Sequence, residues 1–69
     1  MVKEHVSSTK LADMITAKIG VVGLEVVVRK DHAFGWQPSV AAAPGDLIGY
    51  QRRAEEIANR LRMRFDLRD

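Results

Sequence analysis

The first third of the chain carries apolar residues at a helical spacing. Leu11, Ile15 and Ile19 recur four residues apart, which places them on one face of a helix. Ser7 and Ser8 precede this run as candidate helix-capping residues, and Gly20 follows it as a residue that readily adopts the left-handed conformation found after helix ends. The pattern predicts a first helix that ends at Gly20.

The last third of the chain has a longer stripe of the same kind. Its members are Leu47, Tyr50, Ala54, Ile57, Leu61 and Phe65. Spacings of three and four residues predict a single amphipathic helix that runs through Phe65. We expect Asp46 to be its N-cap, with the carboxylate accepting backbone N–H groups.

Between the two helical stretches the period of the pattern changes to two. In residues 24–29, which are rich in valine, a two-residue alternation places Leu24, Val26 and Val28 on one face. The run from Trp36 to Ala43 has the same alternation, so both are predicted strands. The polar stretch Lys30–Gly35 fits a hairpin loop that joins them in antiparallel order. Pro38 cannot donate to a ladder and is expected on an outer edge of the sheet.

The predicted fold class is α+β, with the order helix, strand, strand, helix in one domain over residues 1–69. A lone two-stranded ribbon is marginal in water, so both helices should pack on its apolar face. Residues 1–7 are expected to be a frayed N-terminus. Two chains could pair through strand edges or through the long helical stripe; of the strand edges, that of residues 24–29 lacks proline and is the expected docking edge.

Composition adds an expectation about assembly. The chain has 69 residues, 46% of them apolar, and ordering each residue costs about 1.5 kcal/mol, which leaves little stability for so small a core. Cysteine is absent, and His5 and His32 lack partners at zinc-ligand spacings, so neither disulfides nor a metal should supplement the core. We therefore expect a homodimer, and we expect no cofactor.

The location is predicted from what the sequence lacks. The polar N-terminus has no apolar stretch of the length that a secretory signal needs, and no apolar run is long enough to cross a membrane. The absence of cysteine fits a reducing compartment. These features predict a cytoplasmic protein.

No constellation of residues in the sequence predicts catalysis. Asp31 and His32 are adjacent, but no nucleophile or second acid is placed to work with them. Trp36 is in phase with Val40 and is expected in the core rather than at a ligand. The sequence predicts a non-enzymatic protein-interaction or regulatory module.

An RNA- or DNA-binding module is the alternative. The segment 52–58 resembles the start of the helix with which double-stranded RNA-binding domains contact phosphates, and Arg52 and Arg53 match the cations of that helix. The exposed aromatic residues of the hairpin loop could stack on a base. The candidate contacts with a partner or a nucleic acid are Arg52, Arg53, Arg60, Arg64, Lys30, His32 and Phe34.

Overall fold

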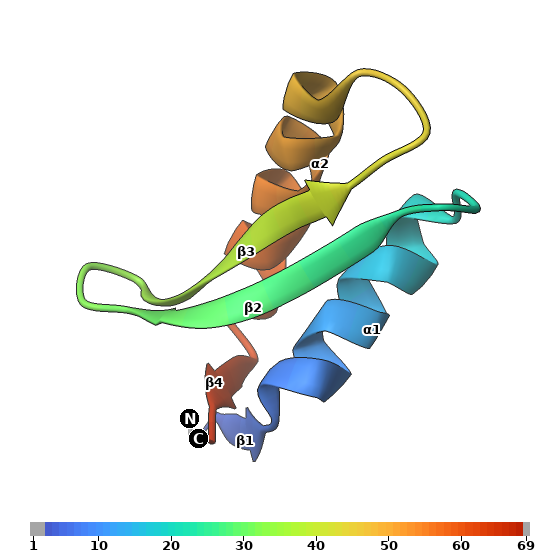
Figure 1. Ribbon diagram of the computed structural model, residues 1–69. Helices are drawn as coiled ribbons and strands as arrows, with labels where there is room; N and C mark the ends of the chain where they lie inside the picture. The colour runs from blue at the N-terminus through green and yellow to red at the C-terminus, as the bar shows by residue number, and fades with distance from the viewer. Residues whose placement is uncertain (1–2, 69) are drawn as a thin grey trace.

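The computed structural model describes residues 3–68 and has an α+β fold, as predicted. Along the described chain the elements are β1 (Glu4–Val6), α1 (Ser8–Ile19), β2 (Glu25–Asp31), β3 (Gly35–Ala42), α2 (Leu47–Leu61) and β4 (Phe65–Leu67) (Figure 1). Strands β2 and β3 form an antiparallel hairpin, and β1 and β4 form a short parallel pair.

The ends of α1 follow directly from the local sequence. The Ser7 hydroxyl oxygen accepts a hydrogen bond from the backbone N–H of Lys10 at 3.2 Å. At the other end Gly20 has φ 68°, in the left-handed region, and its N–H donates to the carbonyl of Thr16 at 2.9 Å. Of the two candidate serines, Ser7 is the N-cap, and the predicted C-terminal glycine is confirmed.

The hairpin is closed by the side chain of Asp31. Its carboxylate accepts hydrogen bonds from the backbone N–H groups of Ala33 at 3.0 Å and Phe34 at 2.8 Å. Gly35 follows with φ 86°, a conformation that side chains with a Cβ rarely adopt, and brings the chain into β3. Each strand is offset by one or two residues from its predicted range, and the loop and the antiparallel pairing are confirmed.

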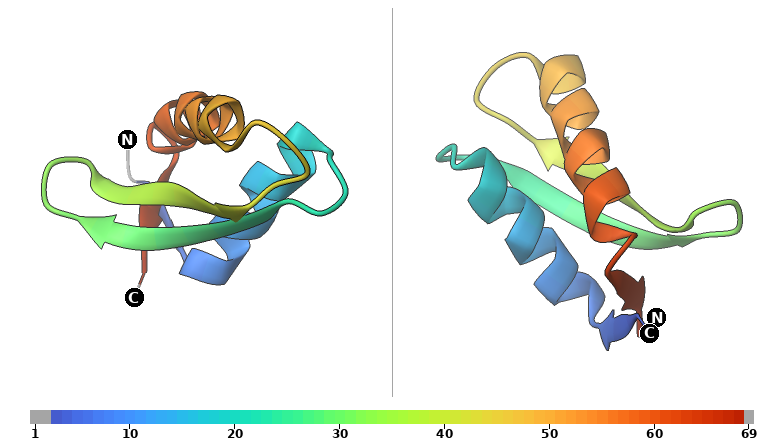
Figure 2. Two further views of the ribbon diagram at one scale, coloured as in Figure 1. Left: turned by 45° about the horizontal axis from the view of Figure 1, so that its top comes forward. Right: turned by 180° about the vertical axis from the view of Figure 1, so that it is seen from behind.

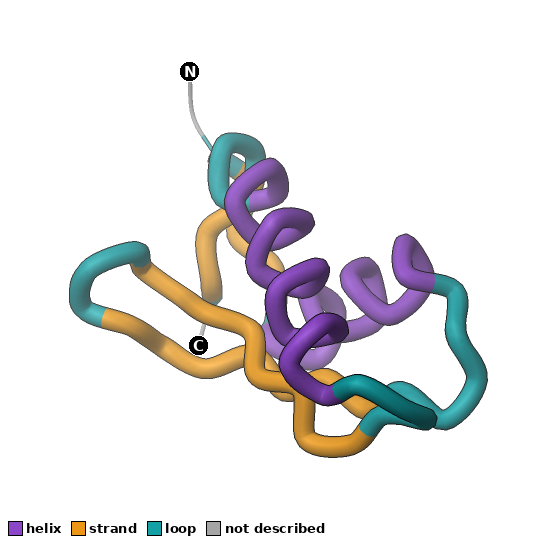
Figure 3. Tube along the Cα trace, turned by 90° about the horizontal axis from the view of Figure 1, so that it is seen from above, coloured by secondary structure: helices purple, strands orange, loops and turns teal. Residues whose placement is uncertain are grey.

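Both helices cover the same face of the hairpin (Figures 2 and 3). The inward residues of the strands are buried, whereas Val27 and Ala41, which point the other way, are exposed. The buried apolar core consists of Val6, Leu11, Ile15, Ile19, Val26, Val28, Trp36, Val40, Ala54, Ala58 and Leu61. Alternation along the strands thus identified the buried face correctly.

The N-terminal segment corrects one expectation. Residues 1–7 were predicted to be frayed, and residues 1–2 lie outside the described chain, but Glu4–Val6 forms β1 and pairs in parallel with β4. The backbone N–H of Glu4 donates to the carbonyl of Arg64 at 3.1 Å, and that of Arg68 donates to the carbonyl of Val6 at 2.8 Å. Val6 is 5% exposed and belongs to the core. The two ends of the described chain therefore lie side by side.

The second helix corrects two further expectations. It ends at Leu61, and Phe65 begins β4 after a turn in which the N–H of Arg64 donates to the carbonyl of Leu61. Asp46 occupies the N-cap position, but its carboxylate accepts no capping hydrogen bond. Gly49 lies so close that a Cβ there would be 2.8 Å from the Asp46 carboxylate, so the glycine leaves room for that side chain.

Candidate functional site

The outer edge of β3 is closed by a side chain of α2. The backbone N–H of Val40 donates to Gln51 Oε1 at 2.7 Å, and Gln51 Nε2 donates to the carbonyl of Pro38 at 3.0 Å. The side-chain amide of Gln51 therefore pairs with β3 as a neighbouring strand would. Pro38 lies on this outer edge, where its missing N–H leaves no gap in the hairpin, as the sequence predicted.

Arg62 continues this closure toward the hairpin loop. Its Nε–H donates to the carbonyl of Trp36 at 2.8 Å, and its guanidinium lies 5.2 Å from the ring centre of Phe34 and 5.1 Å from that of Trp36. Partial burial lowers the pKa of Arg62, and the carboxylates of Asp31 and Glu55 oppose this shift. In the sequence, nothing distinguishes Arg62 from the other arginines near it; in the structure it joins α2 to β3 and to the loop.

The outer edge of β2 is open. In an antiparallel ladder, opposite residues alternate between pairs that exchange both backbone hydrogen bonds and pairs that exchange none. The carbonyl of Pro38 points toward Gln51, so Pro38 and the opposite residue, Val28, form a pair that exchanges no hydrogen bond. The N–H and the carbonyl of Val28 therefore point away from β3. The same holds for Val26 and Lys30 by alternation, and no backbone group elsewhere in residues 3–68 hydrogen-bonds to this edge.

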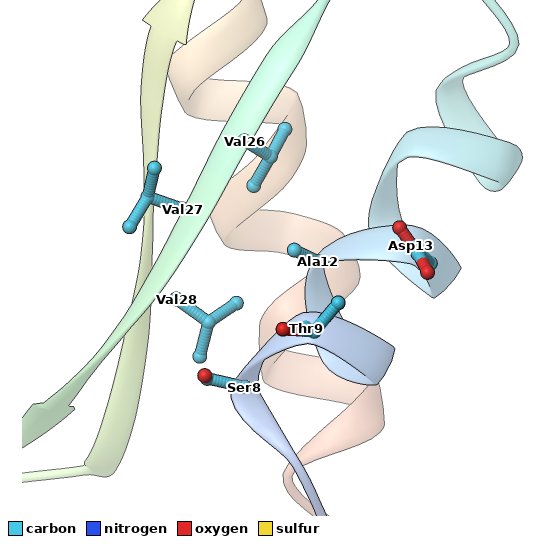
Figure 4. A pocket seen from close by; sticks show the side chains of 7 residues that line it. All are labelled: Ser8, Thr9, Ala12, Asp13, Val26, Val27 and Val28. Atoms are coloured by element: carbon cyan, nitrogen blue, oxygen red, sulfur yellow. The ribbon is translucent and has the colours of Figure 1, made fainter.

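A shallow groove of about 240 Å³ runs beside this open edge, between β2 and the first half of α1. In Figure 4 the side chains of Val26 and Val28 point toward α1, and Val27 points to the opposite side of the strand. The residues that line the groove are Ser8, Thr9, Ala12, Asp13, Val26, Val27 and Val28. The edge that the sequence indicated for docking is thus the one that the rest of the described chain leaves uncovered.

The contact residues predicted from the sequence do not form one surface. Arg60 and Arg64 line a pocket between the two helices, whereas Arg53 lines a hollow near the start of α2. Arg52 is exposed on α2, and Lys30 and His32 are exposed on the hairpin. Phe34 lies against Arg62. Nucleic-acid binding stays a prediction, and its cations are divided among separate parts of the molecule.

A double charge reversal tests the placement of the first two arginines. Arg52→Glu with Arg53→Glu should change the free energy of unfolding by no more than about 0.5 kcal/mol per site, because both side chains are exposed. Urea unfolding followed by circular dichroism measures this. A much larger loss would show that this helix face is packed rather than solvated.

Comparisons with known proteins give no further guide. No protein-family model, no curated protein and no solved structure matches the chain. Neither helix of the described chain has the length and apolar character needed to cross a membrane.

Proposed function

We propose that this protein is a non-enzymatic protein-interaction module of the cytoplasm and that it acts as a homodimer joined through β2. The single observation that supports this most directly is the contrast between the two edges of the hairpin. Gln51 and Arg62 satisfy the edge of β3, whereas the outward backbone groups of Val26 and Val28 on the edge of β2 pair with no other strand or backbone group of the described chain. An open strand edge is a template for pairing with another strand.

A second copy of the chain is a suitable occupant because β2 can pair with itself. Two β2 strands related by a two-fold axis would run antiparallel, and the two hairpins would become one four-stranded sheet. A two-stranded ribbon is marginally stable, and three or more strands with one apolar face are more stable. Val27, which is 36% exposed in the single chain, would then lie at the centre of the joined sheet.

The charges on β2 favour one register. With the two-fold axis at Val27, the open backbone groups of Val26 face those of Val28 of the partner subunit. On the outer face Glu25 then lies opposite Arg29 of the partner subunit, so each dimer gains two pairs of opposite charge. An axis at Val28 would instead place Glu25 opposite Asp31 of the partner subunit, which is a like-charge pair.

Charge reversal at one position is expected to weaken the dimer. Glu25→Arg places an arginine opposite Arg29 of the partner subunit on both sides of the axis, and cross-strand charge pairs contribute roughly 0.2–1 kcal/mol each. Replacing two attractions by two repulsions should raise the dimer dissociation constant by about tenfold to a hundredfold. Sedimentation equilibrium at several protein concentrations measures this constant.

The double variant Glu25→Arg with Arg29→Glu is the matched control. It restores opposite charges in the same register, so its dissociation constant should return to within a few-fold of the original. Both positions are exposed, so the fold of the single chain should be kept in all three proteins. A mass of 7.7 kDa for the unmodified chain at every concentration would contradict the homodimer. A dimer that neither variant affects would contradict pairing through β2.

A further inference from the structure

Residues of both helices line a pocket, and none of its described lining residues belongs to the hairpin. The right-hand view of Figure 2 shows α1 and α2 side by side with the hairpin behind them. The described lining of the pocket comes from the last turn of α1, from the C-terminal part of α2 and from the turn that follows α2, and the pocket volume is about 170 Å³. Its lining residues are Lys18, Ile57, Arg60, Leu61 and Arg64.

The polar part of this lining carries positive charge. Lys18 comes from α1, Arg60 from the last turn of α2, and Arg64 from the turn that follows. Among residues 3–68, no carboxylate lines the pocket and none of these three cations forms an ion pair. Lys18 and Arg60 each complement the dipole of their own helix. The helix dipoles do not explain why Lys18 and Arg60 line the same pocket. They also do not explain the position of Arg64, which lies beyond the end of α2.

We propose that this pocket binds a phosphate group. Three cations that line one pocket without a described carboxylate favour an anion, and the arginine guanidinium presents paired N–H donors that match phosphate oxygens. Ile57 is partly buried and Leu61 is 7% exposed, so the apolar floor would reduce the water around the bound anion. The volume admits one phosphate group, either free or at the end of a larger molecule. This site is separate from the open edge of β2, so it does not depend on the proposed dimer.

Titration with inorganic phosphate tests the site directly. The Nε–H resonances of Arg60 and Arg64 should shift in NMR spectra of the ¹⁵N-labelled protein, with a dissociation constant on the order of 1 mM, as expected for a partly open site. The double variant Arg60→Gln with Arg64→Gln should weaken phosphate binding by about tenfold or more, since it removes two charged hydrogen-bond donors from the pocket. In that variant, backbone resonances around Lys18 report the remaining binding.

The double variant Lys10→Gln with Arg68→Gln is the matched control. It removes the same net charge from exposed positions that do not line the pocket, so phosphate affinity should change by less than about twofold. If the Arg60 and Arg64 variant does not fold, Lys18→Gln tests the pocket from the other helix and should weaken binding several-fold. Equal weakening by the pocket variants and the control, or no shift of the arginine resonances with phosphate, would overturn the proposal.

Two further probes distinguish the sources of the phosphate. A nucleoside 5′-monophosphate represents a small ligand, and an oligonucleotide with or without a 5′-phosphate represents a nucleic-acid end. Tighter binding of the monophosphate than of inorganic phosphate would support a small-molecule ligand. A clear preference for the phosphorylated oligonucleotide over the unphosphorylated one would support a nucleic-acid terminus. Oligonucleotide binding that is indifferent to the 5′-phosphate and leaves the pocket resonances unshifted would count against the site.

Discussion

Trp36→Ala is expected to lower the free energy of unfolding by about 3–5 kcal/mol, the usual cost of deleting a large aromatic side chain from a core. A chain of this length has a stability of roughly 3–10 kcal/mol, so the variant should be largely or wholly unfolded. Trp36 is 1% exposed, and its Nε1–H donates to the carbonyl of Phe65 at 3.3 Å. The same side chain therefore joins the hairpin to β4. Circular dichroism in a urea titration measures the loss.

Trp36→Phe separates the apolar packing from the hydrogen bond. Phenylalanine keeps an aromatic ring in the core but has no donor for the Phe65 carbonyl, so we expect a smaller loss of about 1–2 kcal/mol. Because Phe65 begins β4, the backbone N–H of Arg68, which donates to the carbonyl of Val6, should exchange with solvent faster in this variant. An alanine variant with the unfolding midpoint of the original protein would contradict the central position of Trp36.

Gln51→Ala is expected to have the second largest effect, a loss of about 2–3 kcal/mol. The change leaves the N–H of Val40 and the carbonyl of Pro38 without partners at a partly buried edge, and an unsatisfied group costs about 1–3 kcal/mol. It also opens the edge of β3 to pairing with other chains. We therefore expect a lower unfolding midpoint together with higher oligomers in sedimentation velocity experiments.

Gln51→Glu tests the same edge with a side chain of similar size. A carboxylate can accept from the N–H of Val40 but cannot donate to the carbonyl of Pro38, and it would lie beside Glu55, to which the Gln51 amide now donates at 2.9 Å. The glutamate variant should thus also be destabilised, although its side chain is similar in size. Alanine and glutamate variants that both unfold like the original protein would show that the Gln51 amide does not close the edge of β3.

The sequence predicted the elements whose signals are local. Ser7 and Gly20 bound α1 because a capping hydroxyl and a left-handed glycine act within a few residues of the chain. The inward face of the hairpin followed from the two-residue alternation, since a half-buried strand must place its apolar side chains on one side. These signals depend on neighbours in the sequence and could be detected without tertiary contacts.

The end of α2 could not be predicted in this way. Leu61 and Phe65 are four residues apart, so the helical spacing continues past the point where the helix stops. Residues 62–64 contain neither glycine nor proline to mark the end. Strand β1 was missed for a related reason, because three residues carry too little pattern and their partner, β4, lies at the other end of the chain.

The candidate sites depended still more on the tertiary structure. Gln51 and Arg62 look like ordinary polar residues of a helix in the sequence, and only the packing of α2 beside β3 gives them backbone groups to satisfy. Arg53 and Arg60 lie on one side of α2 but about two turns apart along it, so they line different hollows. Arg60 and Arg64 gained Lys18 as a neighbour from the other helix, whereas Arg52 and Arg53 did not.

The sequence by itself determined the α+β class, the first helix, the hairpin and the face of the hairpin that is buried, because periodicity and capping act over short distances along the chain. Only the tertiary structure decided that the two ends pair, that α2 stops at Leu61, and that α2 closes the edge of β3 while the edge of β2 stays open. Each of these features depends on whether backbone groups form hydrogen bonds with residues far away in the sequence. The spacing of apolar residues does not indicate such hydrogen bonds.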